Sequence, residues 1–307
     1  MVTKAPAAVT KASRTRRRKE TISAYLFLSP ALLVYLFFVI FPLFIVLYLM
    51  FHKYNVITPA QWNDYKNFLK APIDSRIWIT LTNSFKFVVL ICPMHILFAT
   101  LLALGVSSIK NRIAVYTVRT VLYFPTLLAV SSCALAWRYI FSTDFGILNW
   151  FLGLFGVQKI AWLNSSTWFY PAAMIFSLWK NVGYYFLYIY IALQGIDRSV
   201  LEAAELDGAV GARKFFGITL PMISPTLFFV IVTMIIGCIQ IFDEPYIFTG
   251  GGPGDSTRTF SMYIHSTAFA AQNYGYACVL AMMLLIIVLI ITLLQFKASS
   301  WVSYDRE

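Results

Sequence analysis

The sequence has little charge for its length. Asp, Glu, Lys and Arg make up only 12% of its 307 residues, whereas soluble domains carry about 25%. Hydrophobic residues make up 60%, and the mean hydropathy is +0.74. Half the usual charge cannot cover the water-facing surface of a globule of this size. The composition argues against a soluble enzyme, excludes disorder over most of the chain, and indicates a protein that crosses a membrane several times.

Residues that could bind a metal or perform catalysis are also scarce. The four cysteines lie inside apolar segments and have no C-x-x-C partner, so we expect buried free thiols rather than disulfides or a zinc site. They are Cys92, Cys133, Cys238 and Cys278. The three histidines are scattered, and no Ser/His/Asp set stands out. We therefore expect no metal site and no catalytic residues.

A nucleotide-binding loop is missing as well. The sequence contains no G-x-x-x-x-G-K-[ST], and the Gly-rich run at 250–254 is not followed by Lys. Because a phosphate-binding loop needs that lysine, we interpret this run as a turn. The chain itself is therefore not expected to hydrolyse ATP.

Long uncharged runs predict an all-α protein with six transmembrane helices. Each run has about the 20 residues that a helix needs to cross a bilayer. The first is too long for the apolar part of a signal peptide, which has about 7–15 residues. The predicted spans are 21–51, 83–107, 118–138, 168–193, 222–243 and 273–296. We expect extramembrane connections at 52–81, at 138–166 with a short helix, and at 243–272, which is rich in Gly, Pro and Thr.

The basic residues predict the orientation. Seven of them precede the first span, in a tail of residues 1–20. No aromatic residues are interleaved with these charges, so we expect no nucleic-acid binding. With both termini in the cytoplasm, including a tail at 298–307, fifteen of the 24 Lys and Arg residues lie inside and seven outside. This asymmetry favours cytoplasmic termini and a cytoplasmic loop at 194–221.

The loop at 194–221 predicts two short helices joined at a glycine. Ser199 and Glu202 form a capping-box pattern, so we expect the first helix to start at Ser199. Gly208 can end this helix in a left-handed conformation. A second helix is expected at about 212–219, with Pro221 opening the fifth span. The pattern alone is equally compatible with an ordinary amphipathic loop on the membrane surface.

The same loop resembles the EAA loop of bacterial ABC importer permeases. The resemblance rests on Glu202-Ala-Ala-x-x-x-Gly208, followed at the family's spacing by Ile218-x-Leu220-Pro221. It implies that the loop is a coupling helix, which docks into a cleft of a separate ATPase subunit. The coupling residues would then be Glu202, Ala203, Ala204, Gly208, Ile218, Leu220 and Pro221.

Other segments resemble the MalF-type permeases of carbohydrate importers. They are Tyr25-Leu-Phe-Leu-Ser-Pro30, Tyr123-Phe-Pro125 and Thr249-Gly-Gly-Gly-Pro253, and the resemblance covers residues 21–297. It implies a subunit of the bacterial cytoplasmic membrane, surrounded by lipid. Its partners would be a second, MalG-like permease, two ATPase subunits that carry ATP and Mg, and an extracytoplasmic solute-binding protein. The 52–81 connection is too short for the large periplasmic domain of enterobacterial maltose permease.

Polar residues inside two spans are candidates for a sugar path. Sugars need side chains that bond hydroxyls and aromatic rings that stack on the sugar face. Candidates in the fourth span are Ser177, Trp179, Lys180, Asn181 and Tyr184; at the end of the fifth they are Gln240, Asp243 and Tyr246. Lys180 and Asp243 could bind hydroxyls or pair with each other. Alternatively, such residues bond one helix to another.

The favoured function is therefore the transmembrane subunit of an ATP-driven carbohydrate importer. The in-span charges also allow an ion-coupled secondary sugar transporter. In that case the loop at 194–221 would have no evident purpose. A membrane enzyme or channel has no supporting set of residues.

Overall fold

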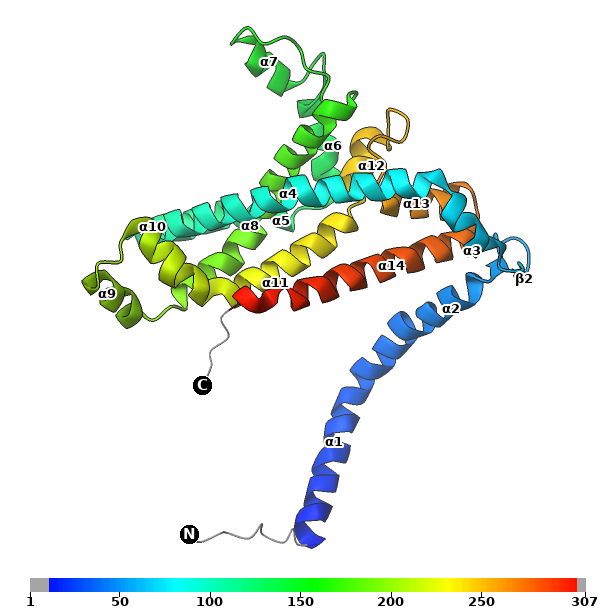
Figure 1. The fold of residues 1–307 in the computed structure, drawn as a ribbon, viewed down its shortest axis with the longest axis horizontal. Coiled ribbons are helices and arrows are strands. Elements are labelled where there is room, and N and C mark those ends of the chain that lie inside the picture. Colours follow the sequence, from blue (N-terminus) through cyan, green and yellow to red (C-terminus); the bar gives the residue numbers. More distant parts are fainter. Residues whose placement is uncertain (1–10, 303–307) are drawn as a thin grey trace.

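The computed structural model describes residues 11–302, and it is built almost entirely from helices (Figure 1). The long helices are α1 (Lys11–Tyr35), α4 (Ser75–Ser107), α5 (Arg112–Leu127), α6 (Val130–Ile140), α8 (Ser166–Gln194), α11 (Leu220–Ile239) and α14 (Tyr274–Lys297). Shorter α-helices are α2 (Phe41–Leu49), α3 (Lys66–Lys70), α7 (Ile147–Gly153), α9 (Arg198–Leu206), α10 (Gly211–Lys214), α12 (Asp243–Thr249) and α13 (Phe260–His265). Three π-helical turns are η1 (Leu36–Ile40), η3 (Phe215–Thr219) and η4 (Ser266–Ala270), and two 3₁₀ turns are η2 (Ala71–Ile73) and η5 (Ser299–Trp301).

Helices α4 and α8 form the centre of the bundle. They pack along each other, α5 lies against α8, and α11 lies against both α4 and α8. Small residues permit this close packing: Ala99 and Ala103 of α4 are completely buried. A Cβ on Gly183 of α8 would overlap the backbone carbonyl of Leu122 in α5. The α5–α8 crossing therefore requires glycine at that position.

The third predicted span, 118–138, is wrong as a single straight helix. It consists of α5 and α6, which meet at an angle of 98° across Leu128 and Ala129. Both residues of the break have extended backbone. The carbonyls freed at the end of α5 are satisfied by Lys180, whose Nζ donates to Pro125 O at 2.8 Å and Thr126 O at 3.1 Å. This lysine thus closes the end of α5.

Four helical stretches are long and apolar enough to cross a membrane. They are Glu20–Leu49, Ser75–Ser107, Gly211–Thr249 and Tyr274–Trp301; the bent α5–α6 pair is a possible fifth. Helix α8 has 29 residues but is not among them. It is surrounded by other helices and carries Lys180 and Asn181 on its buried or half-buried side. A helix inside a bundle can be less apolar than one facing lipid, so hydropathy alone does not establish six spans.

The N-terminal helix stands away from the bundle (Figure 1). The most apolar window of Glu20–Leu49 is 0% buried, and Phe27 is 85% exposed. Only the end of this stretch returns to the bundle, where α2 lies against α14. Within the described chain, the apolar surface of α1 is therefore without a protein neighbour.

The connection at 52–81 is more ordered than predicted. It contains a small antiparallel sheet of β1 (His52–Lys53) and β2 (Gln61–Trp62), so the fold is not strictly all-α. Helix α4 begins at Ser75, earlier than the expected 83, because Asp74 caps it by accepting from Arg76 N. The Asp74 carboxylate also accepts hydrogen bonds from Tyr263 and Tyr276 at 2.5 and 2.6 Å. One carboxylate thus joins the start of α4 to α13 and α14.

The segment at 243–272 is not a plain loop either. It contains α12, α13 and η4, with a Gly-rich turn between α12 and α13. Gly250, Gly251 and Gly254 have φ of +61°, +97° and +60°, which L-residues rarely adopt. The Gly-rich run therefore forms a turn.

Candidate functional site

Residues 197–221 form an elbow at one end of the long helices (Figure 1). Helix α9 begins after Asp197, whose carboxylate accepts from Ser199 N at 2.9 Å. The cap is thus Asp197, and the prediction that Ser199 caps this helix is wrong. Asp197 is exposed, and its hydrogen bond to the backbone N–H of Ser199 holds its pKa below the ordinary value for Asp. A negative charge here also suits the positive end of the helix dipole.

Gly208 ends α9 in the left-handed conformation that the sequence predicts. Its φ is +78°, and a Cβ placed on it would meet nothing within 4 Å. The requirement for glycine is therefore one of backbone conformation and not of space. Beyond the turn, Lys214 of α10 bridges back to Glu205 of α9, with 2.7 Å between Nζ and Oε1. This ion pair joins the two arms of the elbow, which are α9 before the turn at Gly208 and α10 with η3 after it.

The second arm continues directly into the bundle. Pro221 is the second residue of α11, as the sequence predicts, but no break precedes it, because α10, η3 and α11 form one continuous helical stretch. Pro221 has no N–H to donate, and the preceding π-helical turn accommodates it: Leu220 N–H bonds to Phe215 O, five residues back. Ile218, Leu220 and Pro221 are half-buried along this stretch. A movement of the elbow would therefore be transmitted to α11 without a flexible joint.

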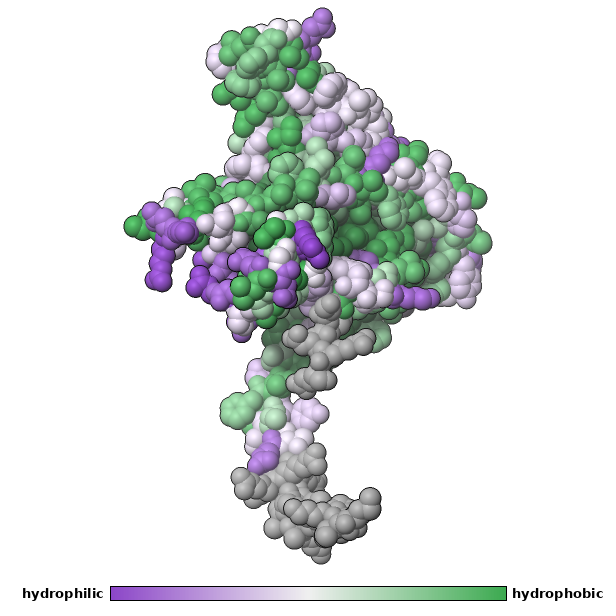
Figure 2. Space-filling view, turned by 60° about the vertical axis from the view of Figure 1, so that its left-hand side comes forward, coloured by the Kyte–Doolittle hydropathy of each residue, from purple (hydrophilic) through white to green (hydrophobic). Residues whose placement is uncertain are grey.

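The outer surface of the elbow is accessible. Glu202 and Ala203 are exposed, whereas Ala204 is buried. Two apolar side chains stand out, Leu206 at 89% exposed and Val210 at 67%. Neither is among the coupling residues predicted from the sequence, although a leucine at the end of a short polar helix is a usable signal. In Figure 2, hydrophilic residues gather mainly at the end that carries α9 and α10, and hydrophobic ones cover much of the sides.

A cavity of about 680 Å³ lies between the elbow and the ends of α4 and α8. Its wall includes Leu104, Gln194, Arg198, Leu201 and Phe215. Leu201 of α9 lies in this wall and also packs against the hydrophobic cluster that contains Ala103 of α4 and Ile189 of α8, so α9 contacts the bundle beside the cavity.

A second cavity lies in the middle of the bundle, and we call it the mid-bundle cavity. It has a volume of about 310 Å³ and is bounded by α4, α8, α11 and α12. Four of the predicted path residues line it, namely Ser177, Asn181, Gln240 and Asp243. The remaining polar wall residues are His95, Tyr185 and Glu244. Glu244 belongs to the polar cluster that the sequence shows at the end of the fifth span, and Tyr185 lies one turn after Asn181 on α8. His95 comes from α4, for which the sequence gave no path residue.

Hydrogen bonds fix part of this wall. Asn181 Nδ2 lies 3.4 Å from Ser177 Oγ, one turn earlier on α8. The two ring nitrogens of His95 lie 3.0 and 3.1 Å from the carbonyls of Ile91 and Ser177. Both ring nitrogens thus face backbone carbonyls, and His95 joins α4 to α8; a neutral imidazole carries a single N–H and donates to only one of the two carbonyls.

The other predicted path residues lie elsewhere. Lys180 bonds the end of α5 and does not pair with Asp243, so that predicted pairing is wrong. Trp179 packs on Trp137 with 5.3 Å between ring centroids. The Tyr184 hydroxyl donates to Tyr188 at 3.3 Å. These three side chains serve contacts between or along helices.

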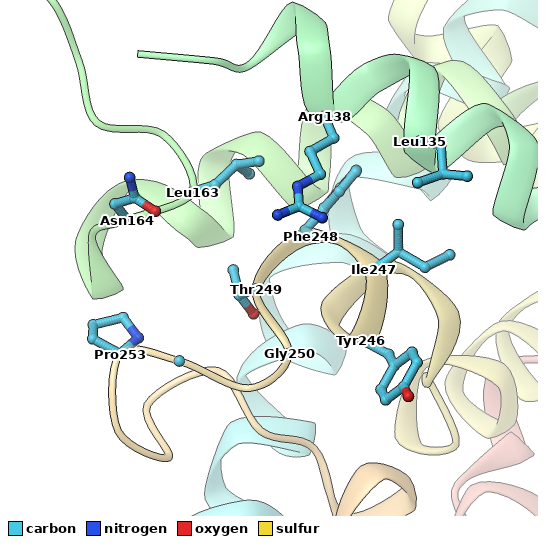
Figure 3. A pocket seen from close by; sticks show the side chains of 11 residues that line it. Leu135, Arg138, Leu163, Asn164, Tyr246, Ile247, Phe248, Thr249, Gly250 and Pro253 are labelled. Carbon is cyan, nitrogen blue, oxygen red and sulfur yellow. The ribbon is translucent and has the colours of Figure 1, made fainter. Parts of the chain in front are cut away.

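Tyr246 lines a wider cavity of about 800 Å³, which also includes Arg138 and which we call the Arg138 cavity (Figure 3). It borders α12, which lies at the opposite end of α11 from the elbow (Figure 1). Figure 3 shows the Arg138 side chain of α6 directed over the turn that follows α12, with Asn164 and Pro253 at the rim. The turn is held by Thr249 Oγ1, which lies 2.7 Å from Thr257 Oγ1. This cavity is an open basin rather than an enclosed site.

Residues 11–302 contain no group of three or more His, Cys, Asp or Glu that could hold a metal ion. All four cysteines, which lie in this range, are free thiols. The closest pair is Cys92 and Cys238, whose Sγ atoms lie 3.4 Å apart between α4 and α11.

Comparison with known proteins gives consistent matches. The family model described as "Binding-protein-dependent transport system inner membrane component" matches residues 95–298. The "Probable ABC transporter permease protein YesP" of Bacillus subtilis (strain 168) is 35% identical over 296 residues, covering 94% of each chain. The lactose transport system permease protein LacF of Rhizobium radiobacter is 30% identical, covering 92% of this chain and 96% of LacF.

A solved structure has the same fold. It is a chain of the bacterial alginate ABC transporter in complex with an alginate pentasaccharide-bound periplasmic protein. The TM-score is 0.82 at 20% identity, with 93% of this chain and 96% of that chain covered. Over most of its length the chain therefore has a fold known from ABC importers.

Proposed function

Since the chain belongs to the family of binding-protein-dependent transport system inner membrane components, we propose that it is one transmembrane subunit of an ATP-driven importer of carbohydrates. The relatives named above support this proposal, because one is a lactose permease and another is a permease of an ABC transporter. The observation that carries it is the elbow, whose second arm is continuous with α11 and whose turn leaves the apolar side chains of Leu206 and Val210 exposed.

The proposed topology has six spans with both termini in the cytoplasm. The spans are α1–α2, α4, α5–α6, α8, α10–α11 and α14. Exposed apolar side chains on α14, such as Leu289 and Leu293, are suited to lipid. Residues 1–10 and 303–307 of the proposed tails lie outside the described residues, whereas residues 11–20 already belong to α1 and 299–301 form η5. The elbow, which lies within the predicted loop at 194–221, then faces the cytoplasm, and the Arg138 cavity faces outside.

In this proposal the elbow couples transport to ATP hydrolysis on a partner. Glu202, Ala203 and Gly208 shape the docking surface, and Ile218, Leu220 and Pro221 connect it rigidly to α11. ATP and Mg bind to the ATPase subunits, since this chain has no phosphate-binding loop. ATP favours the outward-open state only if the ATPase contacts α9 differently in the two states.

Further partners follow from exposed surfaces and from the family. A second, MalG-like permease would complete the path and cover apolar surface such as that of α1. Two ATPase copies would hold the two elbows. An extracytoplasmic solute-binding protein would deliver the sugar, and the alginate transporter, which was solved in complex with a periplasmic protein, supports this part of the proposal.

The proposed solute path includes the mid-bundle cavity. Ser177, Asn181, Gln240 and Asp243 supply groups that bond hydroxyls, and Tyr185 supplies an aromatic plane. The cavity lies on α11, and α11 continues into the elbow. Movement of the elbow can therefore open and close this cavity as the bundle rocks between its two states.

The test is uptake of labelled oligosaccharides in a strain that lacks this gene. We expect uptake to return with the wild-type gene, to stop when ATP is depleted, and to persist with a protonophore while glycolysis maintains ATP. Uptake that survives ATP depletion but stops with the protonophore would instead identify an ion-coupled secondary transporter. Absence of any gene-dependent saccharide uptake would refute the proposal.

A further inference from the structure

A third cavity lies near α3 and α13, at the end of the long helices away from α9 (Figure 1). It has a volume of about 400 Å³, and we call it the basic cavity because three basic side chains line it. They are Lys70 at the end of α3, Arg76 in the first turn of α4 and Arg258 just before α13. Among the described residues that line this cavity, none is Asp or Glu.

Asp255 pairs with both arginines but leaves most of their donors unused. Its Oδ2 lies 3.2 Å from Arg76 Nε, and its Oδ1 lies 2.7 Å from Arg258 Nε. One nitrogen of Arg258 makes a further contact, at 3.5 Å from Ser266 Oγ. Because a guanidinium has five N–H donors, the terminal nitrogens of both side chains can still bind an acceptor in the cavity.

Lys70 makes no ion pair within residues 11–302. Its Nζ lies 4.2 Å from the centre of the Tyr276 ring, and its charge acts on Asp74 through space. The Asp74 carboxylate already accepts from Tyr263, Tyr276 and the backbone N–H of Arg76. Three basic groups and two carboxylates, those of Asp74 and Asp255, therefore leave one excess positive charge at the basic cavity.

The position of this charge needs an explanation. In the proposed topology the basic cavity faces outside, where Lys and Arg are disfavoured in short connections. The bridge through Asp255 fixes the segment before α13 to α4. That bridge needs neither Lys70 nor the remaining guanidinium donors. These groups are therefore suited to an anion from outside the described chain.

Apolar side chains next to the basic ones indicate where this anion comes from. Leu69, Ile73 and Trp78 are 69%, 83% and 65% exposed, and each lies within three residues of Lys70 or Arg76. Tryptophan is enriched where a membrane meets water. Basic pockets between the ends of membrane helices bind phospholipid headgroups. Exposed apolar side chains beside such a pocket can contact the acyl chains.

We infer that the basic cavity binds a phosphate group, and that the group belongs to the headgroup of an anionic phospholipid. A phosphodiester carries one negative charge, which matches the excess positive charge of the cavity. The two guanidinium groups can bind its oxygens in paired hydrogen bonds, and Lys70 adds a point charge. The bound headgroup joins α3, α4 and the segment before α13. Phosphatidylcholine has the same phosphodiester but also brings a positive charge, so it binds more weakly.

The experiment titrates the full chain, purified in a neutral detergent, with phosphatidylglycerol and measures bound lipid by native mass spectrometry. Phosphatidylcholine is titrated in parallel, and inorganic phosphate and glycerol 3-phosphate are added as competitors. The main variant is Lys70→Gln, and its matched control is Lys66→Gln. Both lysines are exposed on α3, but Lys66 lies 3.7 Å from Asp64 and outside the basic cavity.

We expect the wild type to bind one phosphatidylglycerol more tightly than phosphatidylcholine. Lys70→Gln should weaken this binding about fivefold, which is the contribution of one basic residue beside anionic lipid. Lys66→Gln should bind like the wild type. Arg258→Gln should also weaken binding, and if that half-buried position does not tolerate the change, the lysine pair still decides.

The competitors separate the two sources of phosphate. We expect neither to displace the lipid at equal concentration, since neither has acyl chains. Displacement by glycerol 3-phosphate would keep the phosphate site and assign it to a soluble phosphate ester.

Two results would overturn the inference. One is a wild type that binds the two lipids equally tightly, and the other is an equal loss of phosphatidylglycerol binding in Lys70→Gln and Lys66→Gln. Neither result depends on saccharide uptake, so the proposed importer function would stand in both cases.

Discussion

Gly208 shows how one residue without side-chain contacts can be indispensable. Its φ of +78° lies where a Cβ is disfavoured, and the space around it is empty. Gly217, nine residues further on, also has empty space but lies within the helical stretch of the second arm. These two glycines therefore form a matched pair, which separates backbone conformation from packing.

We expect Gly208→Ala to impair coupled uptake, because a non-glycine residue in this conformation costs about 1–2 kcal/mol. That cost corresponds to roughly a 5- to 30-fold shift in the equilibrium between the native elbow and other conformations. Gly217→Ala should leave uptake near the wild-type level. The measurement is sugar uptake and co-purification of the ATPase at matched amounts of inserted permease. Equal behaviour of the two variants would contradict the conformational argument.

Some residues could be predicted from the sequence and others could not. Gly208 was predictable because glycine after a short helix favours a left-handed cap. The cap of α9 was not, because Asp197 and Ser199 are both good caps and only the backbone decides between them. Lys180 was correctly noted as a charge inside a helix, but its partners depend on how α5 packs against α8. Such partners come from tertiary structure, which no local pattern encodes.

At the scale of elements, Asp74 joins three helices that are far apart in the sequence. It caps α4 and accepts the hydroxyls of Tyr263 in α13 and Tyr276 in α14. Burial alone would raise the pKa of this carboxyl, but the bonds from Tyr263 and Tyr276, the bond from Arg76 N and the charge of Lys70 outweigh it. The pKa of Asp74 is therefore lower than its ordinary value.

This lowered pKa predicts a loss of stability in acid. A carboxyl whose pKa is lower in the folded state stabilises the fold above its unfolded pKa, about 3.9, and that contribution is lost as pH falls through the folded pKa. We expect the thermal midpoint of the detergent-solubilised protein to fall more steeply below about pH 4 in the wild type than in Asp74→Asn. The exposed Asp144→Asn variant should follow the wild type. Parallel curves for all three proteins would contradict the role of Asp74.

Element boundaries were harder to predict than the elements themselves. The apolar run at 118–138 is continuous, so hydropathy gave no sign of the 98° bend after α5. Pro125 was the only local sign, and a proline in the last turn of a helix is compatible with either outcome. The mid-bundle cavity was partly predictable, since the polar residues of two spans converge there. Glu244 stands beside the predicted Asp243, but its burial was not predictable, because it depends on how α12 packs against the rest of the bundle.

At the scale of the whole molecule, the low charge and the uneven distribution of basic residues predict the architecture and its orientation together. The exposed apolar surfaces of α1 and α14 are compatible with lipid and with a second permease. The elbow and the Arg138 cavity lie at opposite ends of the long helices (Figure 1). If the proposed orientation is right, these two ends are separated by the membrane.

Thiol labelling tests that separation, because the four native cysteines are buried or half-buried and give little background. The sites are Val210 in the elbow, 67% exposed, and Phe145 near the Arg138 cavity, 92% exposed. We expect an impermeant maleimide to label Phe145→Cys in intact spheroplasts but to label Val210→Cys only after permeabilisation. The wild-type chain, with only its four native cysteines, serves as the control for background labelling. Labelling of Val210→Cys from outside would place the elbow on the wrong side of the membrane for a cytoplasmic ATPase, and the coupling proposal would fail with it.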